Sequence, residues 1–480
     1  MTERVPVPLR TRLAFGLGQL AEGTKNTAFN LFLLFFYSQV LGLPGTLAGF
    51  ALFLATAFDA VTDPLVGSLS DRLRHRWGRR HPFLYAAALP LGVSFTLLFR
   101  PPAGLGEGAL FAWLLCFTIA VRASMTLFHV PHLALGAELS DDYEERTLIA
   151  ATRTAFSLTG VVGVVAGAWL VFFAPSAEHP VGQLNAAAYP AFGLCFGAVM
   201  AVTVLLSAWG THDQIPRLPQ PARDIARFSA RQFWSDYRRA FSNASFRAFC
   251  LGITVFYVMR GLQEVLGVHM FTYFWRLDAD EIFAIGAAAL PGLLVGVPFW
   301  TWAARRYDKR PAFLIGVAGF SACVLGPPVA RIVGFFPEPE SAVYLAILIA
   351  TAVGAAFGAS AGLVLAGSMM ADVADEHELT HGVRQEGIFF AALSFAAKST
   401  SGLGTFLGGV GLDWIEFPTQ AAPEDVSEAT SLALGILYGP GIGVLAVIAL
   451  VFLARYRLDR ARHREIRALL DQRNTRPTSA

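Results

Sequence analysis

Two carboxylates lie four residues apart inside an apolar stretch of the sequence. They are Asp59 and Asp63, and in a helix this spacing places both side chains on one face. Two like charges in surroundings of low polarity do not both ionise readily unless a cation, a proton or a basic group lies beside them. Pro64 follows directly and has no N–H for the carbonyl of Ala60, so that oxygen is available next to the acids. The pattern predicts a site for Na⁺ or H⁺.

A second apolar stretch carries a matching set of polar side chains. Arg122, Thr126 and His129 follow one another at intervals of four and three, which again selects one helical face. Pro131 leaves the carbonyl of Leu127, next to Thr126, without an N–H partner. Carboxylate, hydroxyl and carbonyl oxygens are the ligands that a hard cation takes. Under the alternative, Arg122 neutralises the two acids and the protein works without a coupling cation.

Ionisable side chains recur deep in the other apolar stretches as well. Each costs about 2.5–3.5 kcal/mol or more at the centre of a membrane helix, so a chain does not carry many without a use. We therefore expect them to face a common polar cavity rather than lipid. Two sets with helical spacing, Glu22 with Lys25 and Arg260 with Glu264, are alternatively structural ion pairs. The full set is Glu22, Lys25, Asp59, Asp63, Arg122, His129, Arg153, Arg260, Glu264 and Lys398.

The composition and the length of the apolar stretches predict an all-α membrane protein. Of the 480 residues 55% are hydrophobic and 15% are charged, whereas a soluble domain has about 25% charged residues. A membrane helix needs about 20 mainly apolar residues, and the strands of an outer-membrane barrel are only about 10 residues long. We predict twelve transmembrane helices, at 12–41, 46–70, 82–99, 109–137, 148–174, 186–210, 247–275, 279–303, 311–333, 342–371, 385–414 and 430–455.

Other classes of function find little support in the sequence. The net charge of +2 is too small to indicate a nucleic-acid partner. The four cysteines lie within apolar stretches, where we expect them to pack rather than to form disulfides. A glycine-rich phosphate loop and a nucleophile elbow are both missing, so we predict neither an enzyme nor a bound cofactor. The N-terminus lacks a cleavable signal pattern, and we expect the first stretch to remain a membrane helix.

Lysine and arginine placement predicts the topology. Basic residues gather between the second and third stretches, in 211–246, in 304–310 and after 455, which puts both termini in the cytoplasm of an inner-membrane protein. Segment 211–246 and the tail also have apolar residues at near-helical spacing. Each is either an interfacial helix on the membrane surface or a solvated basic segment. The predicted parts are an N-terminal six-helix bundle at 1–210, a linker at 211–246, a C-terminal six-helix bundle at 247–455 and a tail at 456–480.

The two predicted bundles show a faint repeat. GSLSDRLRHRWGRRHPFLY after the second stretch is echoed by TWAARRYDKRPAFLIG after the eighth, and each basic loop leads into Pro and Phe at the start of the next helix. Two related six-helix halves are typical of transporters whose substrate site lies between the halves near the middle of the membrane.

One motif points to a different chemistry. His377, Glu378 and His381 fit the pattern H-E-x-x-H, in which two histidines on one helical face bind zinc and the glutamate acts as base. A membrane zinc hydrolase is therefore an alternative function. Against it, the motif follows the stretch 342–371 in a predicted loop, and Gly382 comes directly after it.

Four longer motifs carry a resemblance to a known family. They are DAVTDP at 59–64, GSLSD with RWGRRHPF after it, VPHLALGAELSDDYEERT around Pro131, and MMADVADEHELTHGVRQEGIFF from Met369. The chain resembles the melibiose-permease-like branch of the glycoside–pentoside–hexuronide:cation symporters, in the major facilitator superfamily. The resemblance implies twelve helices in two pseudo-symmetric halves and cation-coupled symport by alternating access. It also makes the H-E-x-x-H run a chance variant of a family loop.

The resemblance assigns roles to several residues. Asp59, Asp63 and Thr126 fall on the family's cation-site positions, and Thr62 falls where a melibiose permease has Asn. Further roles that it implies, in sugar binding and in closing the cavity, belong to Arg153 and Lys398.

Two departures from the family pattern bear on the substrate. The family's sugar-binding acids on the first and fourth helices fall here on Gly23 and His129, although Glu22 is adjacent. The remaining polar set is rich in basic groups, which suits an anionic substrate such as a glycosidic acid or uronide. A related branch of the family moves lysophospholipids, so a lipid-like or other organic anion is an alternative. The basic groups are Lys25, Arg122, His129, Arg153 and Lys398.

Taken together, the sequence predicts a secondary active transporter. We expect it to carry a sugar, glycoside or uronide-type substrate together with Na⁺ or H⁺, as a monomer embedded in the lipid bilayer. A receptor built on the same fold, which binds ligand without transport, is a further alternative.

Overall fold

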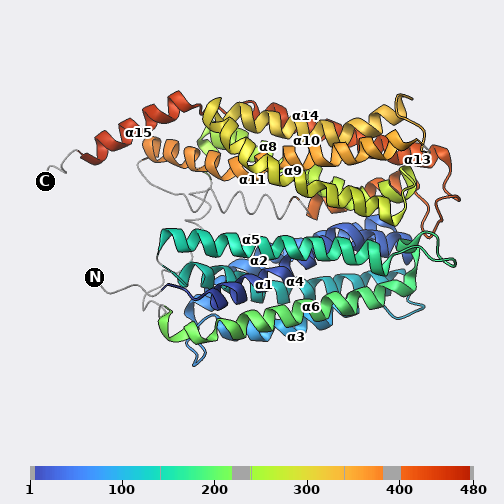
Figure 1. Ribbon diagram of the computed structural model, residues 1–480, viewed down its shortest axis with the longest axis horizontal. Helices are drawn as coiled ribbons and strands as arrows, with labels where there is room; N and C mark the ends of the chain where they lie inside the picture. Colours follow the sequence, from blue (N-terminus) through green and yellow to red (C-terminus); the bar gives the residue numbers. More distant parts are fainter. Residues whose placement is uncertain are drawn as a thin grey trace. The chain divides into compact units, whose positions relative to one another are not determined.

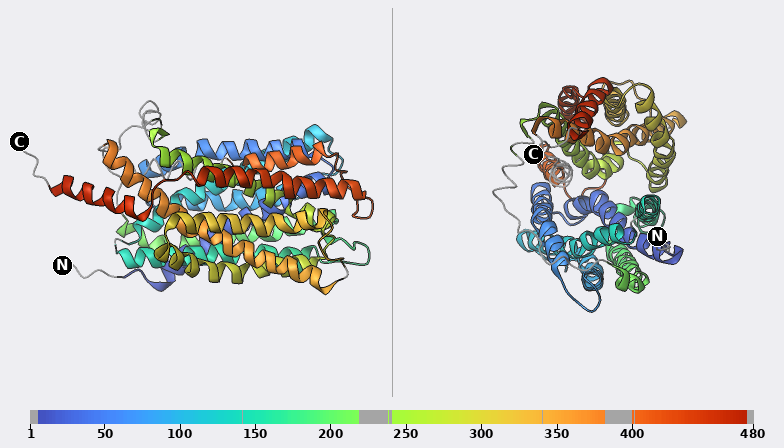
Figure 2. Two further views of the ribbon diagram at one scale, coloured as in Figure 1. Left: turned by 90° about the horizontal axis from the view of Figure 1, so that it is seen from above. Right: turned by 90° about the vertical axis from the view of Figure 1, so that its left-hand side faces the viewer.

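The computed structural model describes residues 6–140, 142–218, 238, 241–339, 341–381, 400 and 402–475. Within them the chain forms long helices, and contacts divide it into two compact units. In each unit the long helices run nearly parallel to one another (Figures 1 and 2). Unit 1 comprises Met1–Ala226, Glu264–Phe283 and Thr405–Ser427, and unit 2 comprises Arg227–Gln263, Ala284–Gly404 and Glu428–Ala480.

The first half of the chain builds most of unit 1. Its first helix, α1, continues through two π-helical segments, η1 and η2, so that residues 9–40 are helical without a break. The elements are α1 (Leu9–Ala28), η1 (Phe29–Leu33), η2 (Phe36–Val40), α2 (Gly45–Arg72), α3 (His81–Leu98), α4 (Glu107–Glu138), α5 (Tyr143–Gly167), η3 (Ala168–Phe172) and α6 (Tyr189–Gly210), with short 3₁₀ turns η4 (Gly182–Leu184), η5 (Ala186–Ala188) and η6 (His212–Arg217).

The second half of the chain supplies the helices of unit 2. Two segments of this half, Glu264–Phe283 and Thr405–Ser427, belong to unit 1. The elements are α8 (Ala244–His269), η7 (Met270–Phe274), α9 (Ala279–Arg306), α10 (Lys309–Ile332), α11 (Ala342–His381), α13 (Glu428–Ile436), η8 (Leu437–Gly441), α14 (Ile442–Leu453) and α15 (Arg460–Thr475).

Ten helices in the described residues are long and apolar enough to cross a membrane, and they correspond to ten of the twelve predicted stretches. The predicted stretch 12–41 is helical too, but it is less apolar because polar side chains lie on its buried side. Gln19, Thr24 and Lys25 are all buried. The stretch 385–414 falls largely outside the described residues. The predicted fold class is therefore confirmed in its helical, multi-pass character, while the count of twelve is not fully tested.

The motif His377–His381 lies in a helix and not in the predicted loop. Helix α11 runs forty residues, from Ala342 to His381, and carries the motif on its last turns. Hydropathy ends the predicted membrane stretch at 371, because charged residues begin there. Charged residues such as Asp and Glu do not break a helix, however, so α11 continues to His381.

Close approach of α1 and α5 depends on small residues. A Cβ atom added at Gly23 would lie 2.1 Å from the carbonyl oxygen of Ser157, and one added at Gly160 would lie 2.4 Å from the carbonyl oxygen of Leu20. Both distances are far below van der Waals contact. Small residues let helix backbones approach closely in membranes, where lipid supplies no hydrophobic force to bring them together.

The faint repeat in the sequence has a structural counterpart. In unit 1, Arg80 precedes the Pro at the start of α3, and its guanidinium lies 2.6 Å from the Glu138 carboxylate at the end of α4. In unit 2, Lys309 lies at the start of α10, near Pro311, and its Nζ lies 2.7 Å from Asp372 of α11. Each half of the chain thus closes the end of its bundle with a basic residue and a carboxylate about sixty residues later.

At the opposite end of unit 1, an acid from the second half of the chain caps a helix from the first half. The backbone N–H groups of Gly45 and Thr46, the first two residues of α2, donate to the Asp413 carboxylate at 2.9 and 2.8 Å. These N–H groups have no partner within the helix, and the negative charge complements the helix dipole. Nearby, the Tyr273 hydroxyl lies 3.2 Å from Gln39 Oε1.

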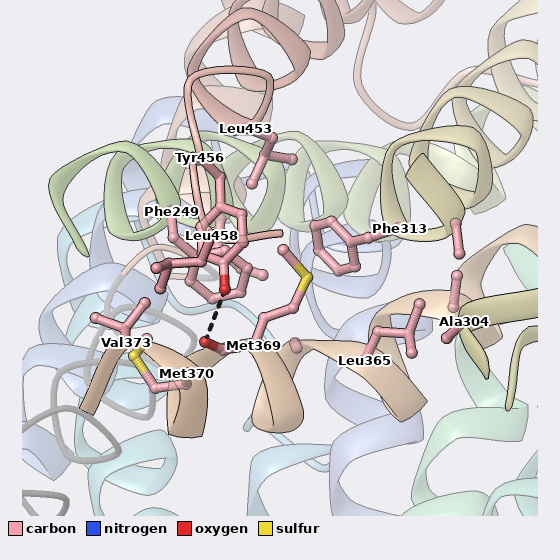
Figure 3. Close-up of a cluster of buried hydrophobic side chains, with 14 of the residues drawn as sticks. Phe249, Ala304, Phe313, Leu365, Met369, Met370, Val373, Leu453, Tyr456 and Leu458 are labelled. Atoms are coloured by element: carbon pink, nitrogen blue, oxygen red, sulfur yellow. Dashed lines mark hydrogen bonds between the residues drawn. The ribbon is translucent and has the colours of Figure 1, made fainter. Parts of the chain in front are cut away.

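Helix α15 packs on the protein with its apolar face. Ile466 and Leu470 are buried in a cluster with Tyr456 and Leu458 (Figure 3). Two of the tail's apolar side chains thus pack inside the protein, while Leu469 is exposed, and whether the tail lies on a membrane surface stays a prediction. The other predicted interfacial helix, between 225 and 237, lies outside the described residues. Burial and nearby carboxylates raise the pKa of the Tyr456 hydroxyl, which stays protonated and donates to the Met369 carbonyl at 3.2 Å.

Replacing Glu138 with Gln tests the ion pair that closes unit 1. Glu138 lies within 2.8 Å of both Arg79 and Arg80, and Arg80 is buried. Among the described residues, Glu138→Gln leaves Arg79 without its carboxylate and leaves Arg80 with Asp71 alone, which lies 2.6 Å away, so we expect a loss of about 2–3 kcal/mol, visible as a lower unfolding temperature in detergent. The matched control is Asp213→Asn, whose partner Arg10 is largely exposed, and it should change stability by about 1 kcal/mol or less. An equal loss of stability in both variants would contradict the structural role of Glu138.

Candidate functional site

The two predicted acids lie on α2, and the first of them, Asp59, forms an ion pair with an arginine side chain. Asp59 is buried, and its Oδ2 accepts a hydrogen bond from Arg122 Nη1 of α4 at 2.5 Å. The contact uses one nitrogen of the guanidinium and one oxygen of the carboxylate. It neutralises the acid in surroundings where an isolated charge would be costly.

The second acid, Asp63, has a neutral partner on α4, the helix that also carries Arg122. Asp63 Oδ1 accepts a hydrogen bond from the Thr126 hydroxyl at 2.8 Å. Both pairs join residues 63 positions apart in the sequence. Equal offsets arise when two helices run in the same direction, since each step along α2 is then matched by an equal step along α4. The two pairs therefore stack one turn apart between these helices.

Polar atoms of the first pair remain unsatisfied. Asp59 Oδ1 and Arg122 Nε are buried and have no hydrogen-bond partner among the described residues. A buried carboxylate oxygen without a donor is an open position for a cation or a proton. The oxygens of Asp59, Asp63 and Thr126 together are the ligand type that Na⁺ takes. The residues present therefore fit a monovalent cation.

Thr62, also predicted at the cation site, has a local partner. Its hydroxyl donates to the carbonyl of Phe58, one turn back in α2, at 3.1 Å. This leaves the hydroxyl oxygen as an acceptor only.

A second polar group lies between α1 and α4. Glu22 Oε1 is 3.9 Å from His129 Nε2, and Gln19 donates to the other oxygen of Glu22. The structure thus places the acid next to Gly23 opposite the histidine that replaces a family acid. His132 belongs elsewhere, because its Nε2 lies 2.9 Å from the Phe15 carbonyl and its ring stacks on that of Phe15.

Lys25 and Arg122 approach the same aromatic ring. Lys25 Nζ lies 5.7 Å from the centroid of Phe29, and the Arg122 guanidinium carbon lies 5.8 Å from it. A cation over an aromatic face is stabilised by the electrostatic field of the ring. Phe29 thus links the lysine of α1 to the arginine that holds Asp59, and both basic groups belong to one local environment.

The departure from the family at Gly23 has a physical reason. Any side chain there would collide with the backbone of α5 at Ser157, so an acid at this position is incompatible with the packing. Arg153 lies on α5, one turn before Ser157, and is half-buried. Among the described residues it has no carboxylate within ion-pair distance.

The remaining predicted site residues come from the second half of the chain. Glu264 accepts a hydrogen bond from Asn30 Nδ2 at 2.9 Å, within unit 1. Arg260 belongs to unit 2, where its guanidinium carbon lies 5.2 Å from the ring centroid of Phe320. Each therefore has a partner on another helix. Lys398 lies outside the described residues.

Sequence reasoning missed three members of this environment, namely Gln19, Phe29 and Asn30. All are uncharged, so a search for ionisable groups passes over them. Helical spacing could have found the first two of them. Gln19 precedes Glu22 by three positions, and Phe29 follows Lys25 by four.

The zinc motif does not form a recognisable metal centre. His377 is buried in α11, and the described residues contain no group of three or more His, Cys, Asp or Glu side chains placed to hold a metal ion.

Comparisons with known proteins agree with the motifs. The chain matches the family model for MFS/sugar transport protein over residues 14–460. The putative glycoside/cation symporter YagG of Escherichia coli is 25% identical over 464 residues, covering 95% of this chain and 93% of that protein. The sodium-dependent lysophosphatidylcholine symporter 1 of Gallus gallus is 23% identical over 504 residues, covering 98% and 90%.

Solved structures share the fold. A mutant of the nucleoside transporter NupG matches with a TM-score of 0.62 at 13% identity, covering 94% of this chain and 99% of that one. The family match confirms that the protein is a multi-pass membrane transporter and not an enzyme, which removes the zinc hydrolase at His377 and His381 as an alternative. Because the family model matches residues 14–460, nearly the whole length, the chain belongs to the MFS/sugar transport family.

Proposed function

We propose that this protein is a symporter that couples Na⁺ or H⁺ to the movement of a small organic anion across the cytoplasmic membrane. The observation that carries the proposal is the pair of contacts between α2 and α4. Asp59 is held by Arg122, and Asp63 is held by Thr126, and one buried oxygen of Asp59 has no hydrogen-bond donor in the described part of the chain. Relatives named as glycoside/cation and sodium-dependent symporters support cation coupling.

Coupling follows from competition for Asp59. When no cation is bound, Arg122 supplies the positive charge that this buried carboxylate needs. Na⁺ or H⁺ arriving at Asp59 and Asp63 takes over that role and releases the guanidinium. A released Arg122 then has its donors available for an anionic substrate. Cation and substrate thus each raise the affinity for the other, which is what symport requires.

The substrate class follows from the basic groups of the predicted polar cavity. Lys25 and Arg122 share the Phe29 ring, and Arg153 lacks a carboxylate partner in the described part of the chain. Such a set suits a carboxylate or phosphate group, as in a uronide, an acidic glycoside or a lysophospholipid-like anion. The relatives' names include a putative glycoside symporter and a lysophosphatidylcholine symporter, so both substrate classes enter the test below.

Transport proceeds by alternating access in this proposal. The Asp413 cap on α2 and the Tyr273–Gln39 contact lie at one end of unit 1, and they have to break when the site opens toward that end. The arginine-rich end, with the Glu138 ion pairs, faces the cytoplasm together with both termini. The transporter works as a monomer built from the bundles 1–210 and 247–455, joined by the linker 211–246.

Sodium binding tests the cation site without knowledge of the substrate. We expect purified wild-type protein to bind ²²Na⁺, and Asp63→Asn to bind it about tenfold more weakly or not at all, because one charged ligand is lost. Scintillation proximity measures both. Asp413→Asn is the matched control, since it also removes one carboxylate charge but at the α2 cap, and its Na⁺ affinity should equal that of the wild type.

The same experiment tests whether H⁺, instead of Na⁺, binds at Asp59 and Asp63. If H⁺ is the coupling ion, the wild type should take up protons at Asp59 and Asp63 and show no saturable ²²Na⁺ binding. Uptake in vesicles would then follow an imposed pH gradient. Indifference to both ions, with Asp63→Asn unchanged, would exclude coupling and leave Arg122 as a permanent counter-ion.

Replacing Arg122 with Gln separates competition from simple neutralisation. Without the guanidinium, Asp59 has no resident cation, so we expect Na⁺ to bind about tenfold or more tightly in the absence of substrate. The same variant should bind the anionic substrate more weakly. Arg462→Gln, on an exposed face of α15, is the control for loss of one positive charge. Unchanged Na⁺ affinity in Arg122→Gln would contradict the proposal that Na⁺ replaces the Arg122 guanidinium at Asp59.

A thermal-shift screen decides the substrate class. The probes are glucuronic acid, a methyl glucuronide, melibiose and lysophosphatidylcholine, each with and without Na⁺. Ligands that bind the folded state raise the unfolding temperature, and we expect the anionic probes to do so more strongly when Na⁺ is present. Arg153→Gln should reduce that shift. A shift from neutral melibiose alone would argue against an anionic substrate.

A further inference from the structure

Five arginines gather at one end of unit 2, where α9 finishes and α10 begins. Two lie at the end of α9, one lies in the first turn of α10, and two lie in the segment between α14 and α15. Four of them are exposed and Arg310 is partly exposed. We call them the arginine patch. Its members are Arg305, Arg306, Arg310, Arg455 and Arg457.

A backbone contact brings the two segments together, although about 145 positions separate them in the sequence. Arg310 Nη2 donates to the carbonyl of Ala454 at 2.6 Å, and Ala454 directly precedes Arg455. From the other side, Arg460 donates to the carbonyls of Ala304 and Arg305 at 2.9 and 2.5 Å. The arginine patch is therefore one surface.

Buried neighbours hold the second segment in a fixed direction. Between Arg455 and Arg460 exposed and buried residues alternate, so the arginines at 455 and 457 point outward while Tyr456 and Leu458 point inward. Figure 3 shows Tyr456 and Leu458 within the apolar cluster, with the Tyr456 hydroxyl bonded to Met369. Side chains presented from such an anchored segment lose less entropy when they bind a ligand.

Aromatic side chains mark the level of this surface relative to a membrane. Trp302 and Tyr307 are exposed beside the patch. The Arg306 guanidinium carbon lies 5.3 Å from the Tyr307 ring, and that of Arg455 lies 5.7 Å from the ring of Phe452. Exposed Trp and Tyr at the end of a membrane helix are typical of the lipid headgroup level.

The helices that end here present apolar side chains below that level. On α9, Leu294, Val295 and Phe299 are exposed, and on α14 Val444, Val447 and Val451 are exposed. A soluble domain would bury such surfaces, whereas in this transporter they suit the acyl chains of lipid.

The arginine patch lacks the neutralising acids found elsewhere in the protein. Among the described residues, none of its five arginines has a carboxylate within ion-pair distance. By contrast, Lys309 next to it is paired with Asp372, and Arg80 in unit 1 is paired with Glu138. The chain thus supplies counter-ions to the basic residues that close each bundle, whereas the described residues place none beside these five arginines.

We propose that the arginine patch is a binding site for a phospholipid with a net negative headgroup. The phosphodiester would be bound by the guanidinium groups, which form charge-assisted and bidentate hydrogen bonds to phosphate. The acyl chains would lie along the apolar faces of α9 and α14. Basic clusters at the end of membrane helices attract anionic lipid in this way, and free phosphate lacks the apolar half of the interaction.

Native mass spectrometry of the full-length protein in detergent tests the site. Phosphatidylglycerol and phosphatidylcholine are the probes, and we expect the protein to retain the first in preference to the second. Arg306→Gln combined with Arg455→Gln should weaken phosphatidylglycerol binding roughly 25-fold, about fivefold for each arginine. Neither side chain makes a hydrogen bond in the described structure, so the fold should survive. Arg462→Gln with Arg464→Gln, on the exposed side of α15, removes the same charge and should leave binding unchanged.

Several results would overturn the proposal. They are equal retention of the two lipids, equal loss in the control pair, or displacement of phosphatidylglycerol by millimolar inorganic phosphate, which would make this a site for soluble anions. If the double variant fails to fold, fluorescence gives the same decision in the wild type. Brominated phosphatidylglycerol should quench Trp302 more than brominated phosphatidylcholine does, with Trp302→Phe as the blank. Equal quenching by the two lipids would also overturn the proposal.

Discussion

A buried carboxylate in a membrane protein needs a positive partner or a proton, and much of the candidate site depends on how Asp59 meets this requirement. Its partner, Arg122, comes from a neighbouring helix and donates a hydrogen bond at 2.5 Å, and the other carboxylate oxygen has no donor among the residues that the structure describes. An ion pair with a full set of hydrogen bonds would be a permanent structural element. A pair with an open oxygen and an open guanidinium nitrogen leaves room for another cation to replace the arginine.

The fold serves this pair by fixing the relation between helices. Small residues allow α1 and α5 to approach each other closely, as at Gly23. Equal offsets along α2 and α4 bring a second acid, Asp63, to Thr126 one turn away. Ion pairs such as that of Arg80 with Glu138 close the bundle at one end, and Asp413 caps α2 near the other. The charges at the ends hold the helices, while those in the middle are the candidates for chemistry.

Helical spacing predicted that Asp59 and Asp63 share one helix face and that Arg122, Thr126 and His129 share another, and the structure shows that Asp63 and Thr126 are hydrogen-bonded. Spacing alone could not decide whether Arg122 bonds to Asp59, because that depends on how far α4 is shifted along α2. The partner of Glu264 was unpredictable for the same reason, since Asn30 lies 234 positions away and is uncharged. Hydropathy placed the ends of membrane stretches well, but not the end of α11, which continues past residue 371 because helix formation does not need apolar residues.

The two ends of the repeated basic loop show how one motif can take two roles. In unit 1 the loop before α3 has its arginines 79 and 80 paired with Glu138, so their charge is used inside the protein. In unit 2, as far as the described residues go, Lys309 is the one basic residue of the corresponding loop that is paired with a carboxylate, that of Asp372. The neighbouring Arg305 and Arg306 are exposed, and Arg310 is partly exposed. A duplicated sequence pattern therefore need not carry a duplicated function, because what a basic residue does depends on whether an acid is placed opposite it. At Asp59 and at the arginine patch alike, the position of the counter-charge decides whether the group holds the structure or binds a ligand.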